Sequence, residues 1–410
     1  MMELHSPSRR LILVASLMIL CIFCVLVNVQ IISAEEEFVK IGVPSAVSGP
    51  KALLGEYTKL GVTYAAEDIN AKGGILGKKV KLIHADTESK VEVGVSAYEK
   101  LITREKVDFI VGEIDSSVAL GTMDVVAKYG IPTIYVIPAA DLLGQKVASN
   151  PDKFRNIFLT DPPTAKMHDG AFYVLDEVSK EGKWMPKSKT AALIIANESY
   201  PINVAKIYRE NLTRMGWEIV VDELVPFEAT DFTSILTKVN SKKPALLKIE
   251  LPSTPAGISI TKQIHEFGID KWALIVGGHS QKTVDFRRSI GMLAEGQLNL
   301  REPYPDWWAA YLNSKKPDLD PIQIMYGYDG MNIMAEAIRK AGSFDYKKVI
   351  DALIETDYKG VFMRTVFDPV THFPKVGADY KIYGIGQYRG GELKLIWPKQ
   401  WAQSEFKAPF

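Results

Sequence analysis

Residues Ala66-Glu67-Asp68-Ile69-Asn70-Ala71-Lys72-Gly73-Gly74-Ile75-Leu76-Gly77-Lys78-Lys79-Val80 join two elements whose order decides the fold class. Upstream, apolar residues recur at helical spacing and predict a helix over Gly55–Asn70. Short apolar runs predict strands over Val80–Ala85, after the helix, and over Phe38–Val43, before it. A strand, a helix and a strand in this order are typical of a parallel sheet covered by helices.

The same alternation continues along the rest of the chain. Strands are predicted over Phe109–Gly112, Thr133–Ile137, Thr190–Ala196, Trp217–Leu224, Ala245–Ile249 and Leu274–Val276, and helices over Val91–Thr103, Ser117–Tyr129, Asn203–Met215, Ser234–Asn240, Gly257–Glu266, Ile324–Ala341 and Tyr346–Ile354. A chain of 410 residues with this repetition suits two α/β lobes better than one domain. Because parallel sheets bind ligands at the carboxyl ends of their strands, we expect a cleft between the lobes. Asp161-Pro162-Pro163 and the turn-rich stretch after Gly291 are candidate passages from one lobe to the other.

The composition excludes several classes of function. Hydrophobic residues make up 47% and charged residues 24%, as in ordinary globular proteins, and the formal net charge is zero. Without a basic excess, nucleic acid is not an expected partner. The only cysteines are Cys21 and Cys24, so the chain from Glu35 onward can form no disulfide and no thiolate metal site.

The first 34 residues have the pattern of an export segment. Arg9 and Arg10 precede the apolar run Leu11–Ile32, and Ala34 is followed by acidic residues. This pattern predicts a signal peptide cleaved after Ala34, although about 20 apolar residues can also serve as an uncleaved membrane anchor. In both cases the folded part lies on the periplasmic or extracellular side of the cytoplasmic membrane.

Three ordered segments carry a family resemblance. They are Ile41-Gly42-Val43 through Ser48-Gly49-Pro50 and Gly55 to Val80; Gly112 through Ser116-Ser117 and Gly130-Ile131-Pro132 to Pro138-Ala139-Ala140; and Ala294-Glu295-Gly296 with Tyr328-Asp329. Together they resemble the branched-chain amino-acid (Leu/Ile/Val) binding proteins of ABC transporters, which are type I periplasmic solute-binding proteins.

The resemblance implies the architecture and the activity. The fold is α/β, with two lobes that each hold a mostly parallel sheet flanked by helices, joined by three crossings. Residues 38–160 and 300–362 would form lobe I, and residues 161–299 and 363–410 lobe II. The implied activity is capture of a small polar ligand by hinge closure, followed by delivery to a membrane permease. The resemblance implies no catalysis, no cofactor and, in most members, a monomer.

Two loops of the first lobe are candidate ligand contacts. Ser116 and Ser117 lie between a predicted strand and a predicted helix, where free backbone N–H groups and hydroxyls can hold a carboxylate. On the residues alone, these serines are equally well explained as a plain helix cap. The resemblance favours contact with the ligand carboxylate. It also implies a contact from the backbone of Ala139, and Asp141 is either a further contact or a solvated turn residue.

The second lobe offers Tyr200, Glu250 and His279. Tyr200 follows a predicted strand and matches a family tyrosine that reaches across the cleft. Relatives that bind amino acids carry an acidic residue where this chain has His279, and a histidine is not a fixed anion. Either Glu250 takes over the pairing with a ligand ammonium, or the ligand is a carboxylate or amide without an amine.

Two other classes of function were weighed against transport. An enzyme is not favoured, because no dinucleotide-binding glycine pattern follows the first strand and neither a P-loop nor a Gly-x-Ser-x-Gly motif occurs. The histidines lack the spacing of metal ligands, so no metal is expected. The remaining alternative is a ligand-binding sensor domain of a membrane receptor or regulator.

Overall fold

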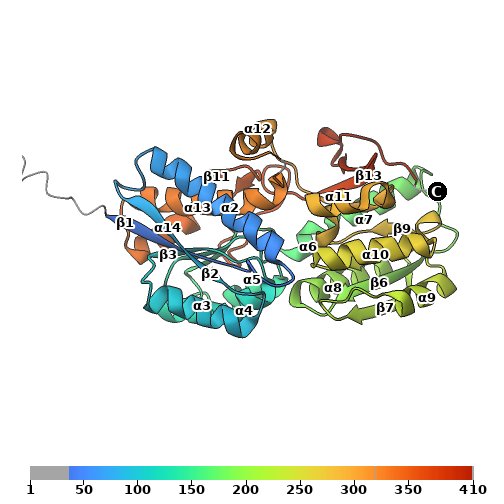
Figure 1. Ribbon diagram of the computed structural model, residues 1–410, viewed down its shortest axis with the longest axis horizontal. Helices are drawn as coiled ribbons and strands as arrows, with labels where there is room; N and C mark the ends of the chain where they lie inside the picture. Colours follow the sequence, from blue (N-terminus) through green and yellow to red (C-terminus); the bar gives the residue numbers. More distant parts are fainter. Residues whose placement is uncertain (1–36, 318, 409–410) are drawn as a thin grey trace, which may run out of the picture.

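The computed structural model describes residues 37–317 and 319–408, which form two α/β lobes side by side (Figure 1). The predicted export segment, residues 1–34, lies outside the described residues. Among the described residues, no helix is both long enough and apolar enough to cross a bilayer.

The first lobe is built on a five-stranded sheet in the order β2-β1-β3-β4-β5. Its strands are β1 (Phe38–Ser45), β2 (Lys79–Asp86), β3 (Phe109–Gly112), β4 (Thr133–Tyr135) and β5 (Ile157–Leu159). All neighbouring pairs are parallel, which confirms the predicted parallel sheet. The three residues of β5 were not predicted as a strand.

Helices cover both faces of this sheet, as β3 illustrates. Phe109 and Val111 face α2 (Ala52–Ala71) and α13 (Pro321–Ala341), whereas Ile110 faces α3 (Val91–Thr103), α4 (Ser116–Tyr129) and α5 (Asp141–Ser149). A strand with both faces buried has a continuous run of apolar residues, as Phe109–Gly112 does. α14 (Tyr346–Ile354) packs against α13.

Two glycines let α2 and α13 pack with their backbones in contact. A Cβ atom on Gly61 would lie 2.1 Å from the carbonyl oxygen of Ile324, and one on Gly327 would lie 2.1 Å from that of Thr58. Only a residue without a side chain fits at such a distance, so this helix pair fixes a late segment of the chain firmly to the first lobe.

The Gly73-Gly74 turn has a steric origin as well. Both residues have positive φ, at 96° and 86°, which disfavours any residue with a side chain. At Gly74 a Cβ atom would also lie 2.0 Å from the carbonyl oxygen of Lys78, whereas at Gly73 it would meet nothing within 4 Å. The turn thus directs the chain from α2 back into β2.

The second lobe is built on a seven-stranded sheet in the order β14-β13-β10-β9-β8-β6-β7. The strands are β6 (Thr190–Ala196), β7 (Glu218–Val225), β8 (Leu246–Glu250), β9 (Leu274–Val276), β10 (Leu298–Arg301), β13 (Gly384–Arg389) and β14 (Glu392–Trp397). The first five run parallel, and β13 and β14 form an antiparallel hairpin on the edge. This hairpin was not predicted, although Gly390-Gly391, both at positive φ, is a recognisable turn signal.

Helices also flank the second sheet on both faces. α7 (Asp169–Lys180) and α8 (Ser199–Arg214) cover one face, and α9 (Thr233–Lys242) and α10 (Thr254–Glu266) cover the other. α8, α10 and α13 begin before the predicted starts at Asn203, Gly257 and Ile324. The physical reason is shared, because each begins with a proline in its first turn, where proline is tolerated.

The chain passes between the lobes three times. The passages follow β5, follow β10 and precede β13, while α13 and α14 return to the first lobe between the second and third passages (Figure 1). The stretch after Gly291 was a candidate passage, but it first adds β10 to the second sheet, and the passage begins after Arg301. The exact lobe boundaries remain a prediction.

Candidate functional site

A cavity of about 40 Å³ lies between the lobes at the carboxyl ends of the parallel strands. Its lining comes from both lobes: Lys51, Leu54, Ile114, Ser116, Ile137, Asp161, Met167, Glu198, Tyr200, Pro252, His279, Lys282, Leu300 and Tyr383. One buried water needs roughly 10–15 Å³, so the lobes in this arrangement leave room for a few waters, and a larger ligand requires them to move apart. This is the predicted place for a ligand in a parallel α/β fold.

The start of α4 presents the Ser116 hydroxyl to the cavity. The N-cap is Asp115, not a serine, and its carboxylate accepts a hydrogen bond from the Ser117 N–H at 2.9 Å. Ser116 Oγ accepts hydrogen bonds from the backbone N–H groups of Ala139 at 3.2 Å and Ala140 at 3.3 Å. With its lone pairs engaged in this way, the hydroxyl hydrogen is available to a ligand acceptor.

A buried charge triad joins the lobes beside Ser116. Lys51 Nζ lies 2.6 Å from Asp115 Oδ2 and also pairs with Glu198 Oε1 on the second lobe. Burial opposes the charge of Lys51, but the two carboxyl groups outweigh it and raise the pKa of the lysine. Burial raises the pKa of Glu198 to about 8, since the attraction of Lys51 offsets only part of the desolvation.

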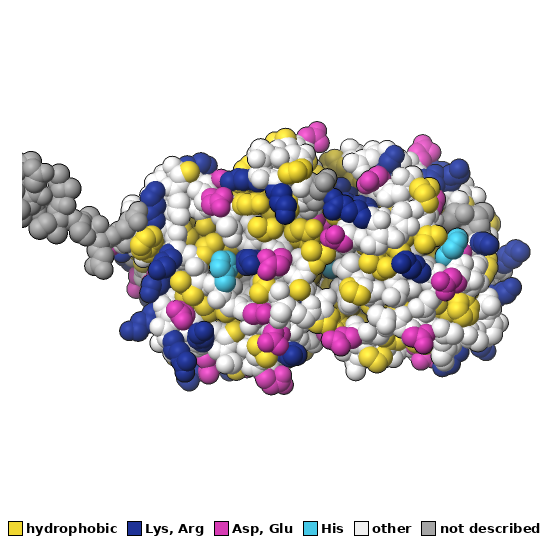
Figure 2. Space-filling view, in the orientation of Figure 1, with side chains coloured by type: hydrophobic (Ala, Val, Ile, Leu, Met, Phe, Trp, Pro, Cys, Tyr) yellow, Lys and Arg dark blue, Asp and Glu magenta, His cyan; other side chains and the backbone are white. Residues whose placement is uncertain are grey.

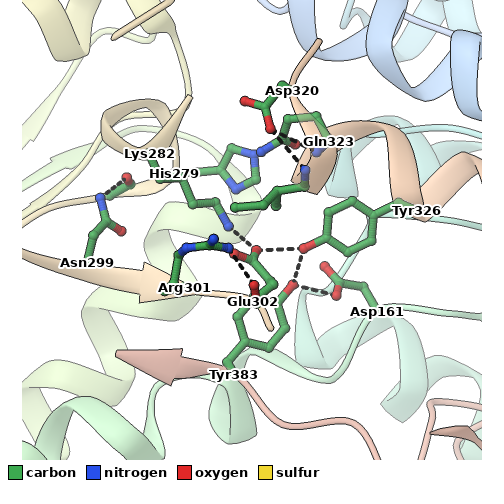
Figure 3. A network of polar contacts seen from close by, with 12 residues as sticks. Asp161, His279, Lys282, Asn299, Arg301, Glu302, Asp320, Gln323, Tyr326 and Tyr383 are labelled. Atoms are coloured by element: carbon green, nitrogen blue, oxygen red, sulfur yellow. Dashed lines mark hydrogen bonds and ion pairs between the residues drawn. The ribbon is translucent and has the colours of Figure 1, made fainter. Parts of the chain in front are cut away.

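A second polar network borders the cavity through Asp161, Lys282 and Tyr383 (Figure 3). Lys282 pairs with Glu302, whose Oε1 accepts the Tyr326 hydroxyl at 2.6 Å. The hydroxyls of Tyr326 and Tyr383 are 2.7 Å apart, and Tyr383 donates to Asp161 Oδ1 at 2.6 Å. Asp161, Glu302 and Tyr383 belong to the first, second and third passages between the lobes. This network, the hinge network, therefore links all three passages to the cavity.

Burial also sets the protonation of two further groups of the lining, Asp161 and His279. It raises the pKa of Asp161 to about 8, although the Tyr383 hydrogen bond and the Lys381 charge oppose the rise. Burial lowers the pKa of His279 well below its usual range, so the imidazole is neutral. The buried Nε2 of His279 has no hydrogen-bond partner among the described residues.

Of the seven site residues expected from the sequence, three line the cavity. They are Ser116, Tyr200 and His279. Tyr200 belongs to the first turn of α8, and its hydroxyl lies 3.5 Å from His168 Nε2.

Ser117 and Asp141 do not line the cavity but bridge the lobes beside it. Ser117 Oγ lies 3.0 Å from Ser199 Oγ, and Asp141 Oδ2 accepts a hydrogen bond from the Asn203 amide at 2.9 Å. These two contacts, the inter-lobe seam, join the starts of α4 and α5 to the start of α8.

Ala139 and Glu250 are likewise absent from the cavity lining. The carbonyl oxygen of Ala139 accepts hydrogen bonds from the N–H and the hydroxyl of Thr164, at 2.9 and 2.6 Å. Glu250 pairs with Lys248 at 2.9 Å and accepts the backbone N–H of His279 at 2.8 Å. Both groups thus have protein partners.

Sequence reasoning missed five polar residues of the lining: Lys51, Asp161, Glu198, Lys282 and Tyr383. One signal could have found most of them. The first four each follow the carboxyl end of a parallel strand by a few residues, after β1, β5, β6 and β9. A charged residue at that place is expected to face the cleft.

Two sheets of parallel strands whose carboxyl ends enclose one shared cavity define a two-lobed receptor for small solutes. The chain belongs to the periplasmic binding protein family, whose model matches residues 39–383. This membership confirms the resemblance and the fold expected from the sequence.

Individual relatives and solved structures match the chain over most of its length. A Leu/Ile/Val-binding protein of Rhizobium johnstonii is 28% identical over 369 residues, which is 87% of this chain and 93% of the relative. The substrate-binding protein of a branched-chain amino acid transporter from Streptococcus pneumoniae, solved with isoleucine, aligns with a TM-score of 0.74 at 23% identity. An ABC-transporter solute-binding protein from R. palustris, solved with benzoate, aligns with a TM-score of 0.75 at 18% identity. The first structure covers 87% of this chain and 98% of its own, and the second covers 87% and 95%.

The chain is therefore a two-lobed solute-binding protein of the periplasmic binding protein family. The family is a transport class, not a class of enzymes, and the sensor alternative gains no support from these relatives. Both signs of charge occur on both lobes of the face in Figure 2, which has no broad basic surface for nucleic acid.

Proposed function

We propose that the protein captures a small carboxylate-bearing ligand in the inter-lobe cavity and delivers it to the permease of an ABC transporter. The observation that carries this proposal is the cavity itself, which takes its lining from both lobes and from the passages between them. A ligand bound there touches both lobes at once, so its binding energy favours the closed arrangement.

The cavity lining holds donors for a carboxylate and apolar side chains for the rest of such a ligand. The Ser116 hydroxyl and the Lys282 ammonium are donors for a carboxylate, because Lys282 forms only one ion pair among the described residues. Leu54, Ile114 and Ile137 supply apolar contacts for a short aliphatic or aromatic group. Isoleucine and benzoate, the ligands of the two solved relatives, share this combination of a carboxylate and an apolar group.

A panel of ligands tests the proposal on the purified protein. Branched-chain and aromatic amino acids, their amine-free counterparts and small amides would be added during thermal unfolding, where a ligand of the folded state raises the melting temperature. The matched variants are Ser116→Ala, which removes a donor in the cavity, and Ser117→Ala, whose hydroxyl faces Ser199. We expect Ser116→Ala to weaken binding about tenfold and Ser117→Ala to weaken it much less. Equal effects of the two substitutions would contradict the placement of the carboxylate.

The export route is part of the same proposal. The segment before the first lobe would direct the chain across the membrane and be removed after Ala34, which leaves a monomeric receptor free to reach its permease. N-terminal sequencing of the exported protein tests this, since an intact apolar segment would indicate an anchored receptor instead.

A further inference from the structure

The cavity lining holds two ammonium groups, Lys51 and Lys282, and two carboxyl groups, Asp161 and Glu198. Asp115 and Glu302 lie outside the lining and pair with the two lysines. Each lysine of the lining therefore already has a carboxyl partner, and the two carboxyl groups of the lining are the candidates for a proton or for a cationic group of a ligand.

Glu198 is the carboxyl group that is open to a ligand. It follows β6 on the second lobe, and its Oε1 pairs across the cavity with Lys51 on the first lobe. Its Oε2 is buried and accepts no hydrogen bond from the described residues, and the neighbouring carboxyl group is that of Asp115. The side chain lines the cavity and is 11% exposed. A buried carboxylate oxygen without a partner is an acceptor site for a ligand donor.

The other carboxyl groups fit this role less well. Glu250, expected from the sequence to meet a ligand ammonium, pairs with Lys248 and does not line the cavity. Asp161 already accepts a hydrogen bond from Tyr383. Asp115 caps α4 and pairs with Lys51.

We propose that Glu198 Oε2 is the counter-ion of a cationic nitrogen on the ligand, so that the cavity selects amine-bearing carboxylates over amine-free ones. This inference rests on the proposed function and adds the substrate class and the residue that selects it. Glu198 also couples the ligand to closure, because the same carboxyl group reaches Lys51 only when the lobes are together.

A proton balance follows from this arrangement. Two charged groups face Glu198: Lys51, which precedes α2, and Asp115, which precedes α4. The residues that follow Glu198 on α8, Ser199 and Tyr200, are uncharged. Burial raises the pKa of Glu198 to about 8; Lys51 opposes this rise and Asp115 adds to it. With the lobes together and no cation beside it, Glu198 therefore holds a proton at pH 7, and a ligand ammonium displaces this proton. The complex with an amine-bearing ligand carries up to one proton less on Glu198 than the complex with an amine-free carboxylate.

Isothermal titration calorimetry with matched ligand pairs tests the inference. Leucine would be compared with 4-methylpentanoate, and phenylalanine with 3-phenylpropanoate, each at pH 7 in phosphate and in Tris. The two buffers have different ionisation enthalpies, so proton release appears as a difference in binding enthalpy. Glu198→Gln is the test variant, and Glu210→Gln, an exposed carboxyl group on the same helix, is its control.

The expected result is selective. The wild-type protein and Glu210→Gln bind the amine-bearing member of a pair more tightly, and the two members differ by up to one proton exchanged on binding. Glu198→Gln loses about tenfold or more in affinity for the amine-bearing member, loses this difference in protons, and changes little toward the amine-free member. Equal losses for both members, or a wild-type preference for amine-free acids, would overturn the inference while leaving the proposed function in place. Failure to bind either member of any pair would overturn both.

Discussion

Replacement of Asp161 by asparagine is expected to stabilise the protein at neutral pH. Asp161 is 3% exposed, and burial raises the pKa of its carboxyl to about 8, whereas the unfolded chain has the usual value near 3.8. Between these two values the folded state holds a proton that the unfolded state has lost, so stability falls as the pH rises from about 4 to about 8. Asparagine keeps an acceptor for the Tyr383 hydroxyl and carries no charge. The stability of the variant therefore does not decrease between pH 4 and pH 8 for this reason.

The magnitude follows from the two pKa values. At pH 7 the difference from 3.8 corresponds to at most about 4 kcal/mol at 1.36 kcal/mol per pH unit, and relaxation of the site reduces it to roughly 1–3 kcal/mol. For a chain of this length each kcal/mol shifts the melting temperature by about 2 °C. The melting temperature of Asp161→Asn should therefore exceed that of the wild type by a few degrees at pH 7.5 and match it near pH 4.

Differential scanning fluorimetry from pH 4 to pH 8.5 provides the measurement. Asp152→Asn, an exposed substitution shortly before the same passage, serves as the control and should parallel the wild type. A difference between Asp161→Asn and the wild type that stays constant over this range would refute the reasoning, because a lost contact without a change in protonation has no such pH dependence.

Three further predictions concern other parts of the structure. Lys51→Met leaves two buried carboxyl groups without their cation, and urea unfolding should show a loss of about 3–5 kcal/mol at pH 8 that shrinks as the pH falls. Gly74→Ala adds a Cβ atom 2.0 Å from a carbonyl oxygen and should cost more than 2 kcal/mol, roughly twice the cost of Gly73→Ala, where only the positive φ is unfavourable; thermal unfolding compares the two. Tyr383→Phe breaks the hinge network at its centre and should weaken ligand binding about tenfold in calorimetry, and unchanged affinity would show that the network does not sense the ligand.

Helices and strands were predicted well from the sequence where a helix was long enough for its apolar period to repeat or where a strand was buried on both faces. Helix α3 and strands β3 and β6 have the predicted bounds for this reason. Strand β5 was not predicted although β9, which is equally short, was, and β13 is stabilised by pairing with β10, from which it is far in sequence. Such pairing is a tertiary effect that local propensity does not register.

The candidate site was harder to predict because its chemistry depends on contacts between the lobes. Ser116 was found from its place between a strand and a helix, but the same reasoning could not separate it from Ser117, whose hydroxyl turns toward the second lobe. The pairing of Lys51 with Glu198 joins residues 147 positions apart, and only the closed arrangement of the lobes brings them together. Burial and the charges of the three groups, not sequence position, then set their protonation.

The inter-lobe seam offers a direct optical or magnetic readout of ligand capture. Leu142 follows Asp141 on α5, Ile202 precedes Asn203 on α8, and these neighbours are 54% and 41% exposed on opposite lobes. Residues 35–410 contain no cysteine, so cysteines introduced at Leu142 and Ile202 would be the only labelling sites in that part of the chain. Spin labels or fluorophores at these two positions would separate when the seam opens and approach when it closes. The distance between the labels would therefore report ligand binding.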